Sequence, residues 1–165
     1  MKRKQKRYDD MFRHPEIREI LASEDFQRLG LYTHHGRVTR KDHCLAVAGM
    51  VYAMARRRRL DYISATRAAL LHDFFFYNWR TEGPRLHGLR HPALAFENAR
   101  TRFTLNSIEE DAIVRHMWPL TPRPPRYAES YLVCMADKAV ALGDYSRFLR
   151  IPRRRRAALG VINYH

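Results

Sequence analysis

Six side chains of the types that bind metal ions are spread along this chain, and several stand in apolar segments. They are His43, His72, Asp73, His91, His116 and Asp137. The adjacent His72 and Asp73 lie between an alanine–leucine run at 68–71 and a phenylalanine run at 74–76, and Asp137 lies in the largely apolar stretch 131–140. A carboxylate in such surroundings is costly unless it is paired or binds a cation. Imidazole and carboxylate groups suit a divalent transition metal (Mn, Fe, Co, Ni or Zn, with Mg also possible), and one cation could offset two carboxylates.

Each of these residues taken singly has an ordinary structural explanation. His43 could cap a helix or lie in the core, and Asp137 could pair with Lys138 or with an arginine. A His-Asp dipeptide is a weak signal by itself. The complete set is more specific, because separate predicted helices each supply a ligand group. We therefore predict that these helices converge on a metal ion.

The order His … His-Asp … Asp resembles the HD superfamily of metal-dependent phosphohydrolases, over residues 39–142. The resemblance is carried by the segments Asp42-His43-Cys44-Leu45-Ala46-Val47-Ala48, Leu70-Leu71-His72-Asp73 and Met135-Ala136-Asp137-Lys138. The His-Asp-Phe-Phe segment and the Arg-His-Met-Trp-Pro-Leu segment at 115–120 are also similar to those of uncharacterised bacterial members. The resemblance implies an all-helical fold, metal-assisted phosphoester hydrolysis and a catalytic role for His72 and Asp73.

Binuclear members of this superfamily add two histidines between the His-Asp pair and the last aspartate, and His91 and His116 occupy such places. By this resemblance Asp73 would bridge two metal ions. One site would be completed by His43, His72 and Asp137, and the other by His91 and His116. His87 is the rival for the role of His91, which we favour because it stands next to Pro92 at a predicted helix start. Whether one ion or two are bound stays open.

Residues near these ligands could contact a phosphorylated substrate. The lysine that follows the pair in many HD hydrolases is missing, since Phe74-Phe75-Phe76-Tyr77 stands in its place. Candidates for binding the substrate are His87, Arg80, Arg90, Arg123 and Lys138. The aromatic residues Trp79, Trp118 and Tyr77 could stack on a base or close the core around the site, and His34 or His35 could face the substrate. The glycine-tyrosine-proline signature of cyclic-di-nucleotide phosphodiesterases is absent, so we do not assign that substrate.

The elements that must position these residues are predicted to be helices. Apolar spacing predicts helices from Pro15 to near Gly30, over 43–58 with Asp42 as cap, from the cap Asp61 to Asp73, from Pro92 to about Phe103, from a Ser107–Glu110 capping box to His116, and over 128–149. Residues 31–42 and 78–90 are predicted loops, and no alternating strand pattern occurs. We predict a compact all-α bundle of five to eight helices, forming one domain over 1–165. Its core spans about 39–142, with a basic extension at 1–10 and a tail at 150–165.

The charge balance is strongly basic, with 31 Lys and Arg against 17 Asp and Glu and a formal net charge of +14. Such a chain attracts polyanions. The excess is concentrated in runs at 2–7, 56–59 and 153–156, without interleaved aromatic residues, so a nucleic-acid surface is possible but not favoured. No apolar stretch approaches the roughly 18 residues of a membrane span. The two cysteines, Cys44 and Cys134, form no CxxC motif and are predicted to be buried free thiols of a cytoplasmic protein.

These observations support three hypotheses about function. The first is hydrolysis of a nucleotide or another small phosphate ester by water that a metal ion activates. The second keeps the fold but makes the chain a diiron oxygenase, which oxygen consumption and tightly bound iron would distinguish. The third is a non-catalytic basic module with a structural metal, which salt-dependent binding to nucleic acid without turnover would favour.

Overall fold

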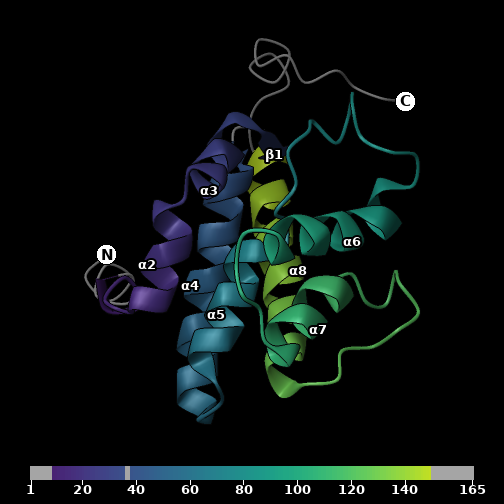
Figure 1. The fold of residues 1–165 in the computed structure, drawn as a ribbon. Coiled ribbons are helices and arrows are strands. Elements are labelled where there is room, and N and C mark those ends of the chain that lie inside the picture. Colours follow the sequence, from purple (N-terminus) through teal and green to yellow (C-terminus); the bar gives the residue numbers. More distant parts are fainter. Residues whose placement is uncertain (1–8, 36–37, 150–165) are drawn as a thin grey trace.

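The computed structural model describes the backbone of residues 9–35 and 38–149 and the side chains of residues 9–34 and 38–144. In this part of the chain the helices are α2 (Pro15–Ala22), α3 (Glu24–Arg28), the 3-10 turn η1 (Leu29–Leu31), α4 (Arg40–Arg58), α5 (Tyr62–Leu71), α6 (His87–Arg100), α7 (Ser107–Arg115) and α8 (Ala128–Leu149) (Figure 1). The predicted all-α class is confirmed. One short antiparallel hairpin, β1 (Thr33–His35) with β2 (Val38–Thr39), lies within the segment predicted to be a loop.

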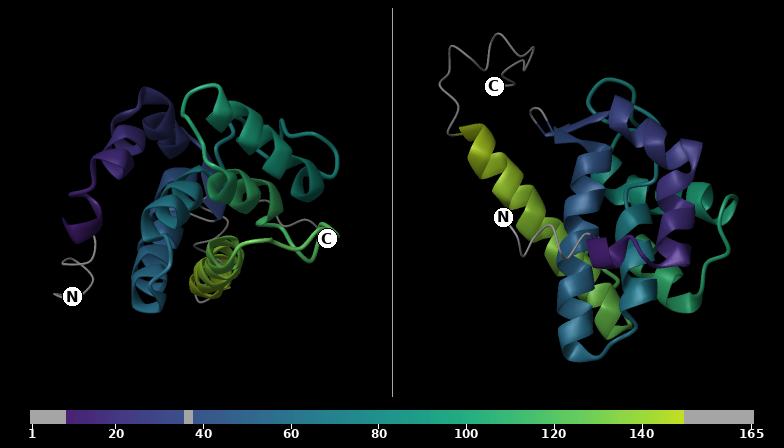
Figure 2. Two further views of the ribbon diagram at one scale, coloured as in Figure 1. Left: turned by 60° about the horizontal axis from the view of Figure 1, so that its bottom comes forward. Right: turned by 90° about the vertical axis from the view of Figure 1, so that its left-hand side faces the viewer.

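Helices α4, α5 and α8 form the centre of the bundle. Helix α5 returns antiparallel along α4, and α8 crosses α4 at an inclined angle (Figures 1 and 2). Helices α2 and α3 cover one flank, while α6 and α7 cover the other, with α7 packed against both α5 and α8. The end of α5 that carries the His-Asp pair is therefore enclosed by α4, α6, α7 and α8.

Small residues allow these helices to approach closely. The buried side chains of α5 include Ala65, Ala68 and Ala69, which belong to a core that also contains larger residues. That core includes Ile17, Ile20, Phe26, Val47, Val51, Leu70, Leu71, Phe74, Ile113 and Val133. Burial of this apolar surface is the main force that holds the helices together. The tight packing also fixes where the end of α5 lies relative to its neighbours.

The start of α4 differs from the prediction. Thr39 is its N-cap, because the Thr39 hydroxyl accepts a hydrogen bond from the backbone N–H of Asp42 at 3.1 Å. The same hydroxyl donates to the Asp42 carboxylate at 2.7 Å, so Asp42 lies inside the first turn and is not the cap. His43 consequently lies within the helix, at the end of its first turn. The cap predicted for α5 is confirmed, since Asp61 accepts from the backbone N–H of Ser64.

Two other helix starts are displaced from their predicted positions. The capping box of α7 is formed by Asn106 and Glu109, one residue before the predicted pair Ser107 and Glu110, because the Asn106 side chain accepts the N–H of Glu109 and the Glu109 side chain accepts the N–H of Asn106. Helix α6 begins at His87, so the predicted start at Pro92 was wrong. Pro92 is the sixth residue of α6 and lies inside the helix, where its missing N–H forgoes one backbone hydrogen bond.

A buried arginine ties the segment that follows the His-Asp pair to α4. Arg40 has no solvent exposure, and its guanidinium donates to the backbone carbonyls of Phe75 at 2.6 Å and Tyr77 at 3.0 Å. The guanidinium carbon also lies 3.6 Å from the centroid of the Phe75 ring. These contacts tie residues 74–77, which follow Asp73 without regular secondary structure, to α4.

Several expectations concern the termini and the charged runs. The basic extension at 1–10 lies almost entirely outside the described residues, and the tail at 150–165 lies wholly outside them. The run Arg56–Arg59 is exposed at the end of α4. Both cysteines are buried free thiols, as predicted. Within the described ranges, no helix has both the length and the apolar character that crossing a bilayer requires.

Candidate metal centre

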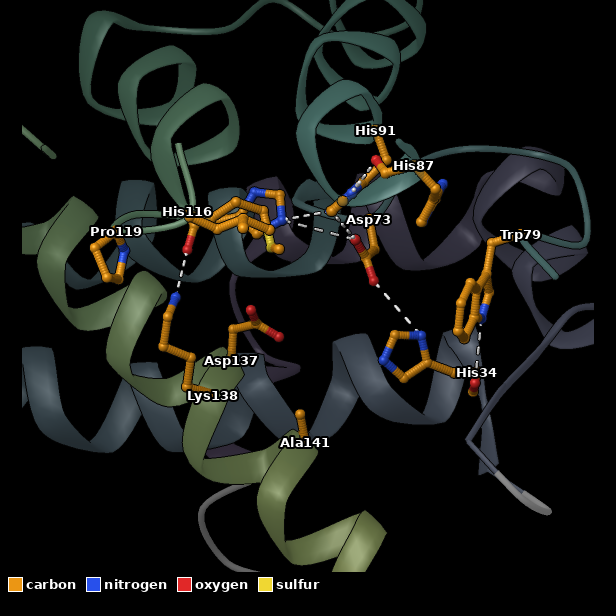
Figure 3. Close-up of a pocket in the computed structure, with 13 residues that line it drawn as sticks. His34, Asp73, Trp79, His87, His91, His116, Pro119, Asp137, Lys138 and Ala141 are labelled. Atoms are coloured by element: carbon orange, nitrogen blue, oxygen red, sulfur yellow. Dashed lines mark hydrogen bonds and ion pairs between the residues drawn. The ribbon is translucent and has the colours of Figure 1, made fainter. Parts of the chain in front are cut away.

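The six predicted ligands come from five helices and meet at the end of α5. His43 lies in the first turn of α4, His72 is the C-cap residue of α5 and Asp73 follows it. The other three are His91 in α6, His116 at the C-cap of α7 and Asp137 in the middle of α8. Figure 3 shows Asp73, His91, His116 and Asp137 facing a common cavity. The fold therefore brings together residues that are up to 94 positions apart in sequence.

One group of potential ligands consists of His43, His72 and Asp137. The Oδ1 atom of Asp137 lies 3.0 Å from Nε2 of His43 and 3.6 Å from Nε2 of His72. Two atoms that bind one ion at about 2.1 Å are separated by roughly 3–4 Å, depending on the angle at the metal. The spacing of these three donor atoms suits a shared cation, and the group can hold a metal ion.

A second group consists of Asp73, His91 and His116. The Oδ1 atom of Asp73 lies 3.2 Å from Nε2 of His91 and 3.8 Å from Nε2 of His116. The two imidazole nitrogens face each other at 2.8 Å. This group can also hold a metal ion, and all three of its members are buried. Because His91 takes part directly and His87 does not, the geometry favours His91 over its rival.

The carboxylate of Asp73 faces both groups. While its Oδ1 atom points toward His91 and His116, its Oδ2 atom lies 3.8 Å from Nε2 of His72. The same Oδ2 atom lies 3.7 Å from Nδ1 of His34. A carboxylate whose two oxygens face different donor groups can contact two cations at once.

The ends of α5 and α7 fix the orientation of two histidine rings. Nδ1 of His72 donates to the carbonyl of Ala69 at 2.8 Å, and Nδ1 of His116 donates to the carbonyl of Ile113 at 2.8 Å. Carbonyls in the last turn of a helix lack an intrahelical donor, so a histidine at the C-cap is well placed to supply one. A carbonyl can only accept, so Nδ1 carries a proton, and in its neutral form each ring presents the lone pair of Nε2 to the centre.

The same arrangement recurs at His91, whose Nδ1 donates to the carbonyl of His87 at 3.1 Å. Three Nε2 lone pairs are thus aimed at two carboxylates. Nε2 of His72 is buried and has no hydrogen-bond partner among the described residues. An unpaired buried acceptor is unfavourable, and a cation would satisfy it together with the facing lone pairs of His91 and His116. The donor set therefore fits a bound metal ion.

Burial and neighbouring charges shift the pKa values of several candidate ligands. Burial, reinforced by the neighbouring His91 and His72, lowers the pKa of His116 to about 3, so this imidazole is neutral near pH 7. Burial would raise the pKa of Asp73, but the neighbouring His72 and His91 imidazoles hold it well below its usual range. Asp137 has a similarly depressed pKa, since the hydrogen bond with His43 and the neighbouring His72 imidazole outweigh its burial. Both carboxylates are therefore ionised.

In contrast to that of His116, the imidazole of His43 carries an additional proton in the metal-free protein at neutral pH. Burial alone would lower the pKa of His43, but its hydrogen bond with Asp137 and the nearby carboxylate of Asp144 raise it to about 9. The folded pKa exceeds the ordinary value of 6.5, so the paired charge stabilises the metal-free fold fully below pH 6.5. This contribution is lost as the pH rises through about 9.

We expect metal binding to displace the proton of His43. At pH 7.5, binding to the group that contains His43 should release about one proton, because a metal ligand must be deprotonated. The apparent affinity should therefore rise with pH up to about 9. Calorimetric titration of the metal-free protein in buffers of different ionisation enthalpy measures the proton release. An affinity that is constant between pH 6 and pH 8 would contradict this account.

Asp144 is a residue of this centre that sequence reasoning missed. Its Oδ2 atom lies 3.7 Å from Nδ1 of His43, on the ring edge opposite to Asp137. Carboxylates commonly orient a metal-binding histidine through its other nitrogen. The available signal was spacing, because Asp144 follows Asp137 by seven residues, or two helical turns, and so shares its face of α8.

We expect Asp144→Ala to weaken metal binding by about 10–100-fold, because the His43 ring loses the group that orients it. Competition with a chromophoric chelator measures the affinity. Leu142→Ala is the matched control, since Leu142 is exposed on the same helix. Equal affinities for the two variants would exclude an orienting role for Asp144.

His34 joins the centre from the β1–β2 hairpin. Its ring stacks on His43, with centroids 4.0 Å apart, and its carbonyl accepts a hydrogen bond from Trp79 Nε1 at 3.3 Å. His34 lines the cavity, whereas the side chain of His35 lies outside the described residues. His34, His43 and Asp73 form a third group whose donor atoms are close enough to hold a cation.

The cavity above the ligands has a volume of about 620 Å³. In addition to Asp73, His91, His116 and Asp137, its lining residues are His34, Trp79, His87, Gly88, Met117, Pro119, Leu120, Lys138 and Ala141 (Figure 3). Of the predicted substrate-binding residues, His87 and Lys138 are therefore present at the cavity. Trp79, predicted to stack on a base or close the core, is there as well.

The other predicted substrate contacts do not line the cavity. Trp118 packs edge-on against Tyr131, and the Arg80 guanidinium lies over the Trp79 ring. Tyr77 contacts the cavity only indirectly, through a 3.0 Å hydrogen bond between its hydroxyl and His87. Arg90 and Arg123 are exposed and lie away from it. These positions depend on the backbone conformation of the loops, which the sequence alone does not reveal.

Comparison with known proteins adds no further information. No family model, curated protein or solved structure matches this chain. The functional assignment below therefore rests on the residues of the centre and their geometry.

Proposed function

We propose that this protein is a metal-dependent phosphohydrolase of the HD type, acting on a nucleotide or another small phosphate ester. The observation that carries the proposal is the buried His72 Nε2 atom. It has no hydrogen-bond partner among the described residues and lies 3.6 Å and 3.8 Å from the carboxylates of Asp137 and Asp73. An open cavity lies directly above these groups. A buried cation site with access for a ligand is the arrangement that such chemistry requires.

The chain provides positions for two cations. His43, His72 and Asp137 would hold one, His91 and His116 would hold the other, and Asp73 would contact both. When bound, divalent ions in such a centre lower the pKa of a water ligand toward about 7 and neutralise phosphate oxygens.

The residues of the chain contribute orientation and exclusion of bulk water. The Nδ1–carbonyl bonds of His72, His91 and His116 keep their Nε2 lone pairs directed at one place without rotation. The ionised Asp73 and Asp137 supply the negative charge that retains cations. The net charge of +14 favours the approach of an anionic ester from solution.

The test is phosphate release after metal replacement. The protein is stripped with a chelator and reloaded in turn with Mn, Fe, Co, Ni, Zn or Mg, and each form is assayed on nucleotides and simple phosphate esters. We expect turnover with at least one metal and its loss in His116→Ala. His14→Ala is the matched control, because His14 contacts Tyr52 on the opposite flank. A protein with stoichiometric metal and no phosphate release from any ester would overturn the proposal.

The same experiment separates the two alternatives. Oxygen consumption by the iron-loaded protein, without phosphate release, would support a diiron oxygenase that uses the same ligands. Salt-dependent binding to nucleic acid without either reaction would support a basic module with a structural metal.

A further inference from the structure

The walls of the cavity are apolar, although its floor is made of metal-binding groups. Met117, Pro119 and Leu120 come from the segment that follows α7, and Ala141 comes from α8. Trp79 lies across the cavity from Pro119 (Figure 3). Leu120 is 58% exposed and so leaves apolar surface available at this site. A volume of about 620 Å³ leaves room for a sizeable organic group beside a phosphate.

The cavity offers little positive charge beyond the cations that its floor would hold. Lys138 is the only basic side chain, histidines apart, among the described residues that line it. Its ammonium group donates to the carbonyls of His116 at 2.8 Å and Cys134 at 3.3 Å, and to the thiol of Cys134 at 3.2 Å (Figure 3 draws the first of these). An ammonium has three donors, and all three are used within the protein. We therefore expect Lys138 to stabilise the backbone at His116 through this hydrogen bond and not to bind phosphate.

The polar wall groups are likewise engaged in contacts within the protein. Trp79 Nε1 donates to the carbonyl of His34, and His87 Nδ1 shares a hydrogen bond with the Tyr77 hydroxyl. No serine, threonine, asparagine, glutamine or arginine belongs to the lining within the described residues. A triphosphate chain would therefore find few counter-charges, and the polar edge of a base would find few hydrogen-bond partners. Leaving such groups unpaired on binding is costly.

We infer that the preferred substrate is the phosphate monoester of an apolar alcohol, whose hydrocarbon group packs between Trp79 and the 117–120 segment. This inference rests on the proposed function and narrows it. The phosphate would be held at the floor, and selectivity would come from burial of apolar surface against the walls.

A series of n-alkyl phosphates tests the inference, because ethyl, butyl and hexyl phosphate share one charge and nearly one leaving-group acidity. With the metal-loaded protein we expect kcat/KM to rise roughly threefold per added methylene, as expected for burial of each group in an apolar site. The kcat/KM for hexyl phosphate should also exceed the values for AMP and ATP. Equilibrium binding of ethyl- and hexylphosphonate, which are not hydrolysed, provides a readout that is independent of turnover.

Two alanines of α8 provide matched variants. Ala141 lines the cavity, whereas Ala139 is exposed on the same helix. Ala141→Leu should lower kcat/KM for hexyl phosphate about tenfold more than for ethyl phosphate, since the added bulk occupies the space of the longer chain. Ala139→Leu should leave the ratio of kcat/KM for hexyl phosphate to kcat/KM for ethyl phosphate unchanged. Leu120→Ser changes an exposed position that tolerates substitution, and it should reduce the increase in kcat/KM with alkyl chain length.

The outcomes are distinguishable. Phosphate release that is equal for ethyl and hexyl phosphate, or fastest for ATP, would overturn the apolar substrate class while the hydrolase assignment stands. If no ester releases phosphate but hexylphosphonate binds much more tightly than ethylphosphonate, the apolar site stands and hydrolysis fails. If the two phosphonates bind equally and no ester is hydrolysed, both the apolar substrate class and the hydrolase assignment would be overturned.

Discussion

Asp73→Asn is expected to abolish metal-dependent turnover. The two oxygens of Asp73 face His91 on one side and His72 on the other, so this substitution affects both candidate metal positions. An amide supplies neither the second oxygen donor nor the negative charge that holds cations. Since a catalytic metal contributes several kcal/mol to transition-state stabilisation, activity should fall by at least about 10³-fold.

The loss should also be visible without an activity assay. Metal at 100 times its Kd should stabilise the original protein by about 2.7 kcal/mol, which corresponds to a rise in Tm of roughly 5–10 °C for a chain of this length. Asp73→Asn should show no such rise, and elemental analysis should find little bound metal. Asp111→Asn is the control, because Asp111 is a similarly buried carboxylate that pairs instead with Arg115 at 2.8 Å. Full metal content in Asp73→Asn would contradict the assignment of the centre.

Arg40→Ala is expected to cause the largest loss of stability. The substitution leaves a cavity and removes the donors to the carbonyls of Phe75 and Tyr77. Unpaired buried polar groups cost about 1–3 kcal/mol each, and a new cavity adds to this. We expect the free energy of unfolding of the metal-free protein to fall by roughly 3–5 kcal/mol, with a decrease in Tm of roughly 8–15 °C.

Urea denaturation of the metal-free protein measures this change. Arg58→Ala is the matched control, since Arg58 is exposed near the other end of α4 and its loss should cost less than about 0.5 kcal/mol. Arg40→Lys should restore little of the stability, because an ammonium lacks the planar fork that reaches two carbonyls. A change below about 1 kcal/mol in Arg40→Ala would show that residues 74–77 are held by other contacts.

Local sequence is sufficient to predict the all-helical class and the burial of the principal candidate ligands. His72 and Asp73 end a run of alanines and leucines, and Asp137 interrupts an apolar helix, so the residues around these polar groups are enough to predict their burial. The order of the candidate ligands along the chain can be read from the sequence without knowing how the helices pack. Even where a predicted boundary was wrong, as for α6, His91 lies on a helix and faces the centre.

The tertiary structure alone decided which neighbouring residues join those ligands. His34 reaches Asp73 from a hairpin without a recognisable strand pattern, and Lys138 lines the cavity with its ammonium turned to the carbonyl of His116. Trp118, which stands two residues after a predicted ligand, instead packs against Tyr131. The physical reason is that the 3.6-residue periodicity specifies which face of a helix is buried, whereas side-chain packing between helices sets their relative positions. Donor distances of roughly 3–4 Å and the nature of the cavity walls depend on those relative positions, and no local pattern encodes them.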